Sequence, residues 1–309
     1  MAQQLGPIQW AVIQSYGRAF SRRGLVIRVQ TSTASQPCLF SDGSPLLDKA
    51  PHCFWTWDDR DDVNPEAGDC RWIWHHGPLR ALADGDSRIL LLPRNDLFEF
   101  RGMDNTPEAW VQYRSQIEVP WDEKRNEAYF IGSFTGRHDA LNSRLRACQL
   151  MLQAGLPTHM GILPFNVPPE LAGRAPLLAP EPLSAMAQYR FVLSLSGNHP
   201  WNPRIYRGLE GGSLVFHQAT PTIRHLDDGI LQAQRHFVEI APDLSDLVAK
   251  VQYFIDRPAE ARDIAEEGHK TWMENLYAEL PYSIPAVMWD RLTGQAGWQE
   301  FLEAFDVHN

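Results

Sequence analysis

The loop at residues 132–137 combines residue types that can hold phosphate oxygens. Its two glycines let the backbone come close to a ligand, and its two hydroxyls and one guanidinium can donate hydrogen bonds to an anion. The residues concerned are Gly132, Ser133, Thr135, Gly136 and Arg137. The loop lacks both the Gly-Lys-Ser/Thr ending of a P-loop and the GxGxxG spacing of a dinucleotide fingerprint. By itself it fits an ordinary strand-to-helix turn equally well.

A second set of such residues lies in the segment 197–207. An asparagine and an arginine fall where a short helix is expected to begin, and an arginine can grip a diphosphate through two charge-assisted hydrogen bonds. The residues concerned are Gly197, Asn202, Arg204 and Arg207. This segment, taken alone, is no more specific than the first.

The elements around both loops follow an alternating strand and helix pattern. Apolar runs predict strands at 128–134, 190–196, 214–216 and 236–240, and helices over 138–154, over 203–209, from about Asp243 and from Pro258. This alternation predicts a parallel sheet covered by helices within residues 121–280. In such sheets ligands bind beyond the carboxyl ends of the strands, which is where both loops would lie. The first 120 residues are less regular, with a helix expected at 10–20 and strands at 24–29 and 88–92.

The composition of the chain excludes several classes of protein. The chain has 309 residues, of which 44% are hydrophobic and 21% charged, so a disordered or fibrous protein is excluded. A formal charge of −10 provides no basic field, so we expect neither nucleic acid nor an anionic bilayer as a partner. No apolar stretch is long enough to span a membrane, and the start has no basic and apolar leader pattern. A cytoplasmic protein is expected, with peripheral attachment to the inner face of the membrane left open.

Metal binding is not expected from the spacing of the candidate ligands. The four cysteines, at positions 38, 53, 70 and 148, fit neither a CxxC knuckle nor a dense disulfide scaffold, and we interpret them as reduced thiols. The acidic run 58–62 contains a formal D-x-D pattern. We interpret it as a solvated loop, because hard cations need converging oxygens.

Three segments together resemble the CAP10-like glycosyltransferases, family 90. The segment 119–136, VPWDEKRNEAYFIGSFTG, is similar to the family's W…K…a-y-f-r-G-s-t motif. The segments 189–197, YRFVLSLSG, and 204–217, RIYRGLEGGSLVFH, are similar to its y-k-y-l…G…S-x-R-f…l-x-x-g-S-l-v-f motif. The segments 236–247 and 264–268 resemble its ending. The motifs occur in the family's order.

This resemblance implies an α/β fold of GT-B type, with two Rossmann-like halves and a cleft between them. The expected domains are an acceptor-side domain at 1–120, a nucleotide-sugar-binding domain at 121–285 and a C-terminal helix at 286–309 that packs back on the first domain. The family implies an inverting transferase that uses a UDP-sugar as co-substrate and no cofactor or divalent metal. The acceptor would be a hydroxyl of a glycan, a lipid-linked saccharide or a protein.

The resemblance also assigns roles to residues. Arg204 matches the family's diphosphate-binding arginine, and Ser133, Thr135, Gly197 and Ser213 match positions that line the donor. Lys124 and Arg144 match further basic positions. The predicted donor site also includes four residues of the loops described above, Gly136, Arg137, Asn202 and Arg207. Asn202 stands where the family has a serine, two positions before the arginine.

An inverting transfer also needs a general base to deprotonate the acceptor. The family uses an aspartate at the end of a strand in the first domain, and Asp96 follows the expected strand 88–92. Asp58, Asp59, Asp61 and Glu99 compete for this role. Asp96 and Pro120 are only 24 positions apart, closer than in the eukaryotic enzymes, so the acceptor class stays open.

Two other functions fit the same features. One is the related exostosin-like glycosyltransferase architecture, which shares a Gly…Arg loop; the 243–268 segment favours family 90. The other is a non-catalytic nucleotide-sugar or glycan-binding relative that has kept the donor loops and lost the base.

Overall fold

The computed structural model describes residues 53–56, 72–75, 89–91, 106–165, 167–171, 173–174, 176–197, 204–219, 229–281, 283–295 and 298, with side chains from residue 106 onward. The helix expected at 10–20 and the strand expected at 24–29 lie outside these residues. Among the described helices, none combines the length and apolar character needed to cross a bilayer.

The chain divides into two compact units, which we treat separately. One comprises Trp110–Pro221 and Gly229–Glu274, and the other comprises Met1–Ala109, Thr222–Asp228 and Asn275–Asn309. The second of these contains helix α8 (Ala286–Thr293) and a parallel sheet of three strands in the order β1-β2-β3. Its strands are β1 (Cys53–Thr56), β2 (Trp72–His75) and β3 (Ile89–Leu91). Strand β3 confirms the strand predicted at 88–92.

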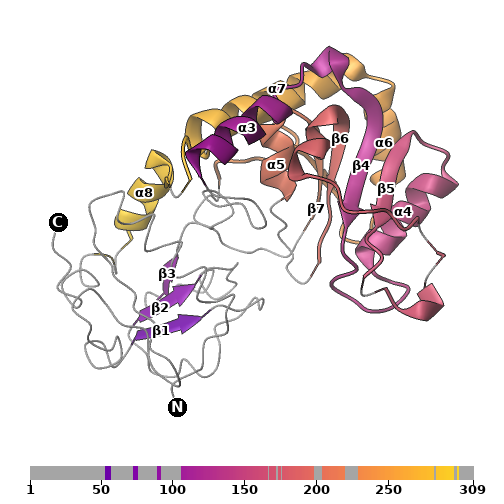
Figure 1. Ribbon diagram of the computed structural model, residues 1–309, viewed down its shortest axis with the longest axis horizontal. Helices are drawn as coiled ribbons and strands as arrows, with labels where there is room; N and C mark the ends of the chain where they lie inside the picture. Colours follow the sequence, from indigo (N-terminus) through magenta and orange to yellow (C-terminus); the bar gives the residue numbers. More distant parts are fainter. Residues whose placement is uncertain are drawn as a thin grey trace. The chain divides into compact units, whose positions relative to one another are not determined.

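The other unit is built on a five-stranded sheet in the order β5-β4-β6-β7-β8 (Figure 1). Its strands are β4 (Arg125–Gly132), β5 (Thr158–Ile162), β6 (Tyr189–Ser194), β7 (Leu214–Gln218) and β8 (Val238–Ile240). Every neighbouring pair is parallel, so the predicted α/β class with a parallel sheet is confirmed. From β4 the chain moves outward to β5, and from β6 it moves outward in the other direction to β7. The central pair β4 and β6 is therefore the topological switch point, where open α/β sheets bind ligands.

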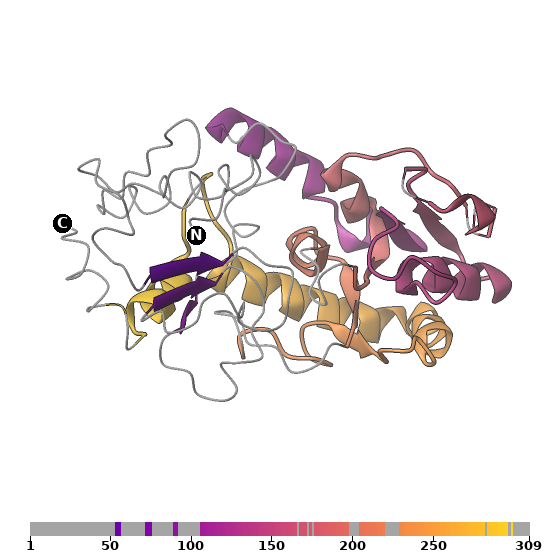
Figure 2. The ribbon, with the colours of Figure 1, turned by 90° about the horizontal axis from the view of Figure 1, so that it is seen from below.

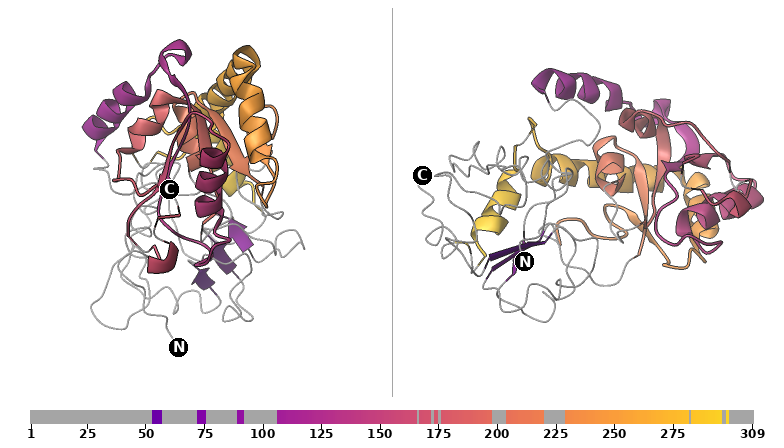
Figure 3. Two further views of the ribbon diagram at one scale, coloured as in Figure 1. Left: turned by 90° about the vertical axis from the view of Figure 1, so that its right-hand side faces the viewer. Right: turned by 60° about the horizontal axis from the view of Figure 1, so that its bottom comes forward.

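Helices cover both faces of this sheet. The unit's helices are α3 (Pro107–Ile117), α4 (Ser143–Gln153), α5 (Arg204–Glu210), α6 (Leu247–Ile255) and α7 (Pro258–Asn275), with short 3₁₀ turns η4 (Trp121–Glu123), η5 (Pro169–Leu171) and η6 (Leu183–Gln188). Figure 3, left, shows the sheet between α5 on one side and α4 and α6 on the other. Figure 2 shows α5 end-on beside the long α7, where Tyr206 stacks on Trp272 with ring centroids 5.2 Å apart.

The main core lies between the sheet and the helices α4, α6 and α7. Alternate strand residues point into it, which the period of two in a β-strand requires. Its buried members include Phe130, Phe191 and Phe216 from the strands, and Leu145, Cys148, Val251 and Ala265 from the helices. Cys148 is a free, buried thiol, in keeping with the expected reduced state, and burial raises its pKa to about 12.

The helix predicted from residue 138 begins five residues later, at Ser143. Asn142 is its N-cap: the side-chain oxygen accepts hydrogen bonds from the backbone N–H groups of Arg144 and Leu145, at 3.0 and 3.1 Å. The residues before it form a turn instead, because the Asn142 amide donates to the carbonyl oxygens of Thr135 and Arg137. This cap fixes where the loop ends and α4 begins.

Strands β1 and β2 of the other unit and the short 3₁₀ turns were not predicted, and neither were two longer elements of the five-stranded unit. Strand β5 contains His159 and Gly161 and lacks the continuous apolar run of its neighbours. Helix α3 begins with Pro107, which suits the first turn of a helix, and buries Trp110, Tyr113 and Ile117 on one face. The spacing of these three residues is that of one helix face, so the helix could have been predicted from the sequence.

Candidate functional site

A cavity of about 260 Å³ lies at the carboxyl ends of β4 and β5, beside the start of α5. Its walls come from the ends of both strands, from the connector before β6, from α4 and from α5. The lining residues are Tyr129, Ile131, Gly132, Ser133, Arg144, Leu163, Pro180, Glu181, Pro182, Leu183, Met186 and Arg204. Four residues singled out from the sequence, Gly132, Ser133, Arg144 and Arg204, are thus brought to one cavity at the switch point.

Arg204 is the first residue of α5 and reaches the end of β4. Its Nη2 donates a hydrogen bond of 3.0 Å to the carbonyl oxygen of Ile131, and its guanidinium carbon lies 4.6 Å from the centroid of the Phe130 ring. Burial lowers the pKa of the guanidinium to about 10, so it keeps its charge at neutral pH. A Cβ at Gly132 would lie 3.3 Å from Nη2, so a larger residue there would crowd the arginine.

Arg144, on α4, brings a second guanidinium to the cavity. Its Nη1 donates to the carbonyl oxygen of Ser133 at 2.8 Å, and its Nε donates to that of Ser196 at 3.1 Å. Burial, together with the charge of Arg204, lowers the pKa of Arg144 to about 9. Arg144 therefore connects the loop after β4 to the loop after β6 and remains charged at neutral pH.

The two predicted loops pack directly against each other at Gly136 and Gly197. Gly136 has a φ of +87°, and a Cβ there would lie 2.9 Å from the Gly197 carbonyl oxygen. A Cβ on Gly197 would lie 2.3 Å from Nη2 of Arg144 and 2.7 Å from Oγ1 of Thr135. Only glycine fits this contact without displacing its neighbours. Gly136, Thr135 and Gly197 thus support the cavity by bringing the loops together.

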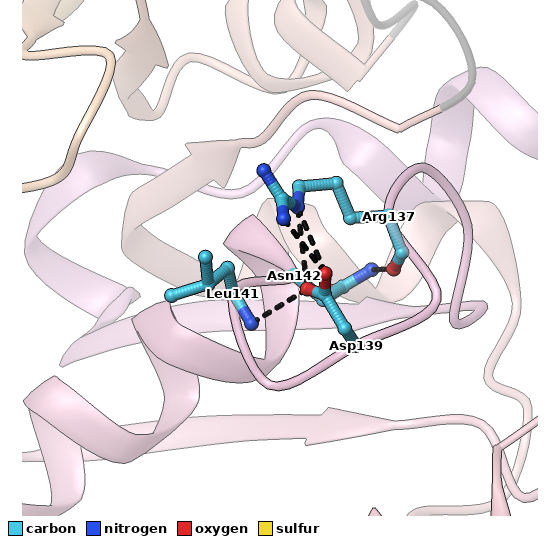
Figure 4. Close-up of polar contacts among 4 residues, drawn as sticks. All are labelled: Arg137, Asp139, Leu141 and Asn142. Atoms are coloured by element: carbon cyan, nitrogen blue, oxygen red, sulfur yellow. Dashed lines mark hydrogen bonds and ion pairs between the residues drawn. The ribbon is translucent and has the colours of Figure 1, made fainter.

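Arg137 is not among the residues that line the cavity. It forms a two-pronged ion pair with Asp139 on the surface, with Nη2 2.7 Å from Oδ2 and Nε 3.2 Å from both oxygens (Figure 4). Asp139 also accepts a hydrogen bond of 2.8 Å from the Leu141 N–H. Figure 4 shows this turn in front of the Asn142 cap, so Arg137 shapes the loop rather than the cavity.

Lys124 lies at the opposite edge of the sheet. It immediately precedes β4, whereas Ser133 immediately follows this eight-residue strand, and nine steps of about 3.3 Å put the two roughly 30 Å apart along the strand. The buried Nζ donates to the carbonyl oxygen of Gly211 at 2.7 Å and also to that of Ala187. Burial lowers the Lys124 pKa to about 8. Lys124 joins two turns at the amino ends of the strands and is not brought to the cavity.

Ser213 and Arg207 also lie away from the cavity. Ser213 precedes β7, and its hydroxyl donates to the carbonyl oxygen of Tyr189, the first residue of β6, at 2.7 Å. Arg207 forms a buried ion pair of 2.6 Å with Glu210, which also accepts a hydrogen bond from the Tyr113 hydroxyl at 3.3 Å. These contacts are inside the protein and hold α5, α3 and the strand starts together.

The remaining predicted residues lie outside the described part of the chain. These are Asp96 and its competitors Asp58, Asp59, Asp61 and Glu99, and Asn202. Their roles stay predictions. Within the described residues, no three His, Cys, Asp or Glu side chains gather in a way that could hold a metal ion.

Glu181 is a cavity residue that the sequence motifs did not indicate. Its Oε1 lies 2.8 Å from Nε2 of His159, and its Oε2 accepts a hydrogen bond of 3.3 Å from the Tyr129 hydroxyl. Burial and the Glu181 charge raise the pKa of Tyr129. Glu181 lies in the proline-rich connector, which has no motif, so only the fold could place it here.

The position of Lys124 leads to a first prediction. Replacing Lys124 with methionine should lower the free energy of unfolding by roughly 1–3 kcal/mol, because the buried carbonyl groups of Ala187 and Gly211 lose their donor. Affinity for UDP should stay within about twofold of wild type, because the cavity is at the other edge of the sheet. Urea unfolding and calorimetry with UDP measure the two effects. A tenfold loss of UDP affinity in a folded variant would contradict this prediction and show that Lys124 contributes to the donor site.

A parallel, helix-covered sheet with a cation-lined cavity at its switch point defines an α/β domain whose ligand site lies beyond the carboxyl ends of the strands. The sequence model of glycosyl transferase family 90 matches residues 98–285. The chain belongs to this family.

The matches to similar proteins cover only part of each of those proteins. Over 191 residues the chain is 27% identical to human protein O-glucosyltransferase 3, and the match covers 59% of this chain and 35% of that protein. Over 184 residues it is 29% identical to protein 027R of Frog virus 3, covering 52% of this chain and 19% of the viral protein. The chain therefore spans about a third or less of the relatives it matches.

Two solved structures align with part of the chain at low sequence identity. Anabaena HepE, solved in complex with UDP-glucose, is 11% identical with a TM-score of 0.45, and the match covers 77% of this chain and 65% of that one. Sucrose-phosphate synthase from Thermosynechococcus elongatus is 16% identical with a TM-score of 0.42, covering 70% and 53%.

Proposed function

We propose that this protein is an inverting glycosyltransferase that moves a sugar from a UDP-sugar onto a hydroxyl group. The observation that carries the proposal is the buried guanidinium of Arg204 on the wall of the switch-point cavity, 3.0 Å from the end of β4. Family membership supports the reaction class, and the position of this cation supports our placing the leaving group at the end of β4.

The chemistry of the transfer suits this cavity. When the bond from the sugar to the diphosphate breaks, negative charge grows on the departing UDP. Fixed cations and oriented donors stabilise such charge without having to reorganise. Because guanidinium groups can supply this stabilisation, we propose that a divalent metal is not required.

The rest of the cavity wall suits the nucleoside part of the donor. Beside the arginines the wall includes the apolar side chains of Ile131, Leu163, Leu183 and Met186. Small-molecule sites are mostly apolar with a few polar groups that fix orientation, and Glu181 is such a group here. This combination supports a nucleotide with a charged end and a flat base.

The acceptor side of the proposal rests on Asp96. Inversion requires the acceptor hydroxyl to attack from the side opposite to the diphosphate, with a base nearby to take its proton. We propose Asp96 as this base and a glycan, lipid-linked saccharide or protein hydroxyl as the acceptor. The non-catalytic alternative retains the cavity but lacks turnover.

The decisive experiment is a donor screen followed by a turnover assay. Thermal unfolding is followed with UDP-glucose, UDP-xylose, UDP-galactose and UDP-N-acetylglucosamine, because a ligand that binds the native state raises the melting temperature. The best donor is then tested for hydrolysis or transfer, and NMR of the product reports whether the anomeric centre is inverted. We expect turnover in wild type and none in Asp96→Asn, with UDP binding retained in both. Binding without wild-type turnover favours the non-catalytic alternative, and no response to any UDP-sugar contradicts the proposal.

A further inference from the structure

Gln218 is the last residue of β7, and its buried side chain lies at the edge of the sheet where the parallel strands end. The side-chain amide makes hydrogen bonds to three different segments. Its Oε1 accepts from the backbone N–H of Ser196 at 2.9 Å. Its Nε2 donates to the carbonyl oxygen of Pro242 at 2.6 Å and to the Ser143 hydroxyl at 3.2 Å. One side chain thus joins the loop after β6, the loop after β8 and the start of α4.

Two of these partners are next to residues of the candidate site. Ser143 is followed by Arg144, which lines the cavity, and Ser196 is followed by Gly197, which packs against the loop after β4. The carbonyl oxygen of Ser196 also accepts the hydrogen bond from Nε of Arg144 at 3.1 Å. Gln218 therefore holds both sides of the contact between the loop after β6 and α4.

The contacts of Gln218 require a primary amide. The Ser196 N–H needs an acceptor and the Pro242 carbonyl needs a donor, and a glutamine side chain provides both. A carboxylate would place a second acceptor against the Pro242 carbonyl. A hydrocarbon or thioether chain would leave the buried backbone groups without these partners, which is costly. Gln218 is therefore suited to this position by its hydrogen-bonding groups as well as by its size.

The location of these contacts distinguishes Gln218 from a residue that only stabilises the domain. Its three partners are loop residues or the first residue of a helix, at the edge of the sheet where open α/β folds bind ligands. Without the amide, the strands keep their backbone pairing, whereas the loop after β6 and α4 are free to shift relative to each other. A shift of this kind changes the site more than it changes the core.

We propose that Gln218 is a positioning residue of the donor site. Its amide fixes the loop after β6 and the start of α4 in the arrangement that binds the donor. Gln218 is not among the residues that line the cavity, so it acts through Arg144 and Gly197 and not by touching the ligand. This inference rests on the proposed function, because it concerns how the same site is held in shape.

The first test compares Gln218→Met with wild type and with Tyr113→Phe as the control. Tyr113 donates a buried hydrogen bond of 3.3 Å to Glu210, near the amino ends of the strands, so its replacement also removes a buried hydrogen bond and leaves the cavity intact. Calorimetry with UDP and with uridine is carried out well below each melting temperature. We expect Gln218→Met to weaken UDP by roughly ten- to a hundredfold, because a guanidinium that is displaced loses its hydrogen bonds to the phosphates. Uridine should weaken by less than about threefold in this variant, and Tyr113→Phe should bind both ligands as wild type does.

The second test uses Gln218→Glu and its dependence on pH. A protonated carboxyl group can donate to the Pro242 carbonyl and accept from the Ser196 N–H, as the amide does, whereas an ionised one cannot donate. Burial raises the pKa of a carboxyl group, so the variant should bind UDP almost as wild type does at about pH 6 and progressively less well towards about pH 9. The ratio of variant to wild-type affinity is measured at each pH, which cancels the titration of UDP itself. The same ratio for Gln218→Met should not change with pH.

Three results would overturn the inference. One is unchanged UDP affinity in a folded Gln218→Met variant. Another is an equal loss of UDP and uridine affinity in that variant, which a general loosening of the domain predicts. The third is an affinity ratio for Gln218→Glu that does not depend on pH. If Gln218→Met does not fold, the pH dependence of Gln218→Glu decides.

Failure of the inference can be distinguished from failure of the proposed function. Wild type that binds and turns over a UDP-sugar, with Gln218→Met equally active, would contradict the role of Gln218 and leave the proposed function intact. Wild type that responds to no uridine nucleotide would contradict the proposed function and, with it, this inference.

Discussion

Replacing Arg204 with methionine should weaken UDP binding by roughly 1.5–3 kcal/mol, about ten- to a hundredfold, and reduce sugar transfer at least as much. Methionine retains the contact with the Phe130 ring but removes the charge and the hydrogen bond to Ile131. The effect on transfer should exceed the effect on binding if the arginine acts most strongly on the charge that develops as UDP leaves. Calorimetry with UDP and steady-state kinetics with the best donor measure the two quantities.

Arg125→Met is the matched control for this variant. Arg125 is exposed, begins β4 and bonds the Tyr189 hydroxyl at 3.1 Å, so it lies at the edge of the sheet away from the cavity. It should bind UDP as wild type does. Unchanged UDP affinity in a folded Arg204→Met variant would show that the phosphate is bound elsewhere and would remove the main support for the proposed site.

Replacing Gly268 with alanine should destabilise the protein by about 1–3 kcal/mol, although the same change in an exposed helix stabilises by about 1 kcal/mol. Gly268 is buried within α7, and a Cβ there would lie 2.2 Å from the carbonyl oxygen of His236 and 2.7 Å from Cδ2 of Leu209. The carbonyl belongs to the backbone just before β8 and cannot rotate away as a side chain can. The helix must therefore move, and it would lose packing against α5, the helix that begins with Arg204.

Urea unfolding of Gly268→Ala measures this prediction, with Lys270→Ala as the control. Lys270 is exposed on the same helix, so its replacement should change the free energy of unfolding by less than about 0.5 kcal/mol. A Gly268→Ala protein as stable as wild type would mean that α7 adjusts freely against β8 and α5.

Local patterns predicted most of the sheet and its helices correctly, and their failures have local reasons. Strands β4, β6, β7 and β8 are apolar runs, and such runs are recognisable without knowing their partners. The start of α4 was placed five residues early because the Asn142 side chain bonds the preceding loop as well as capping the helix. Strand β5 was missed because it owes its place to pairing with β4, and its own sequence gives little signal.

For the candidate site, the structure brings some of the residues predicted from the sequence to one cavity and places others away from it. The glycine loops and Arg204 follow strands that end at the same edge, so their meeting followed from the parallel pattern alone. Lys124, Arg207 and Ser213 carry suitable side chains and lie within the same motifs. They precede strands or end a helix, and their side chains reach the other edge of the sheet or the protein interior.

The sequence by itself determined the family, the α/β class and the two loops that meet at the switch point, because each depends on short-range patterns of apolar residues and glycines. Only the tertiary structure decided which charged groups share a cavity. Arg144 and Arg204 are 60 positions apart in the sequence and both line the cavity near the Phe130 ring, whereas Lys124 is much nearer to Ser133 in sequence and lies at the far end of a strand. Successive residues of a strand are about 3.3 Å apart, so the two ends of a strand lie at opposite edges of the sheet. A helical connection returns the chain across the sheet, so the next parallel strand ends at the same edge as the first.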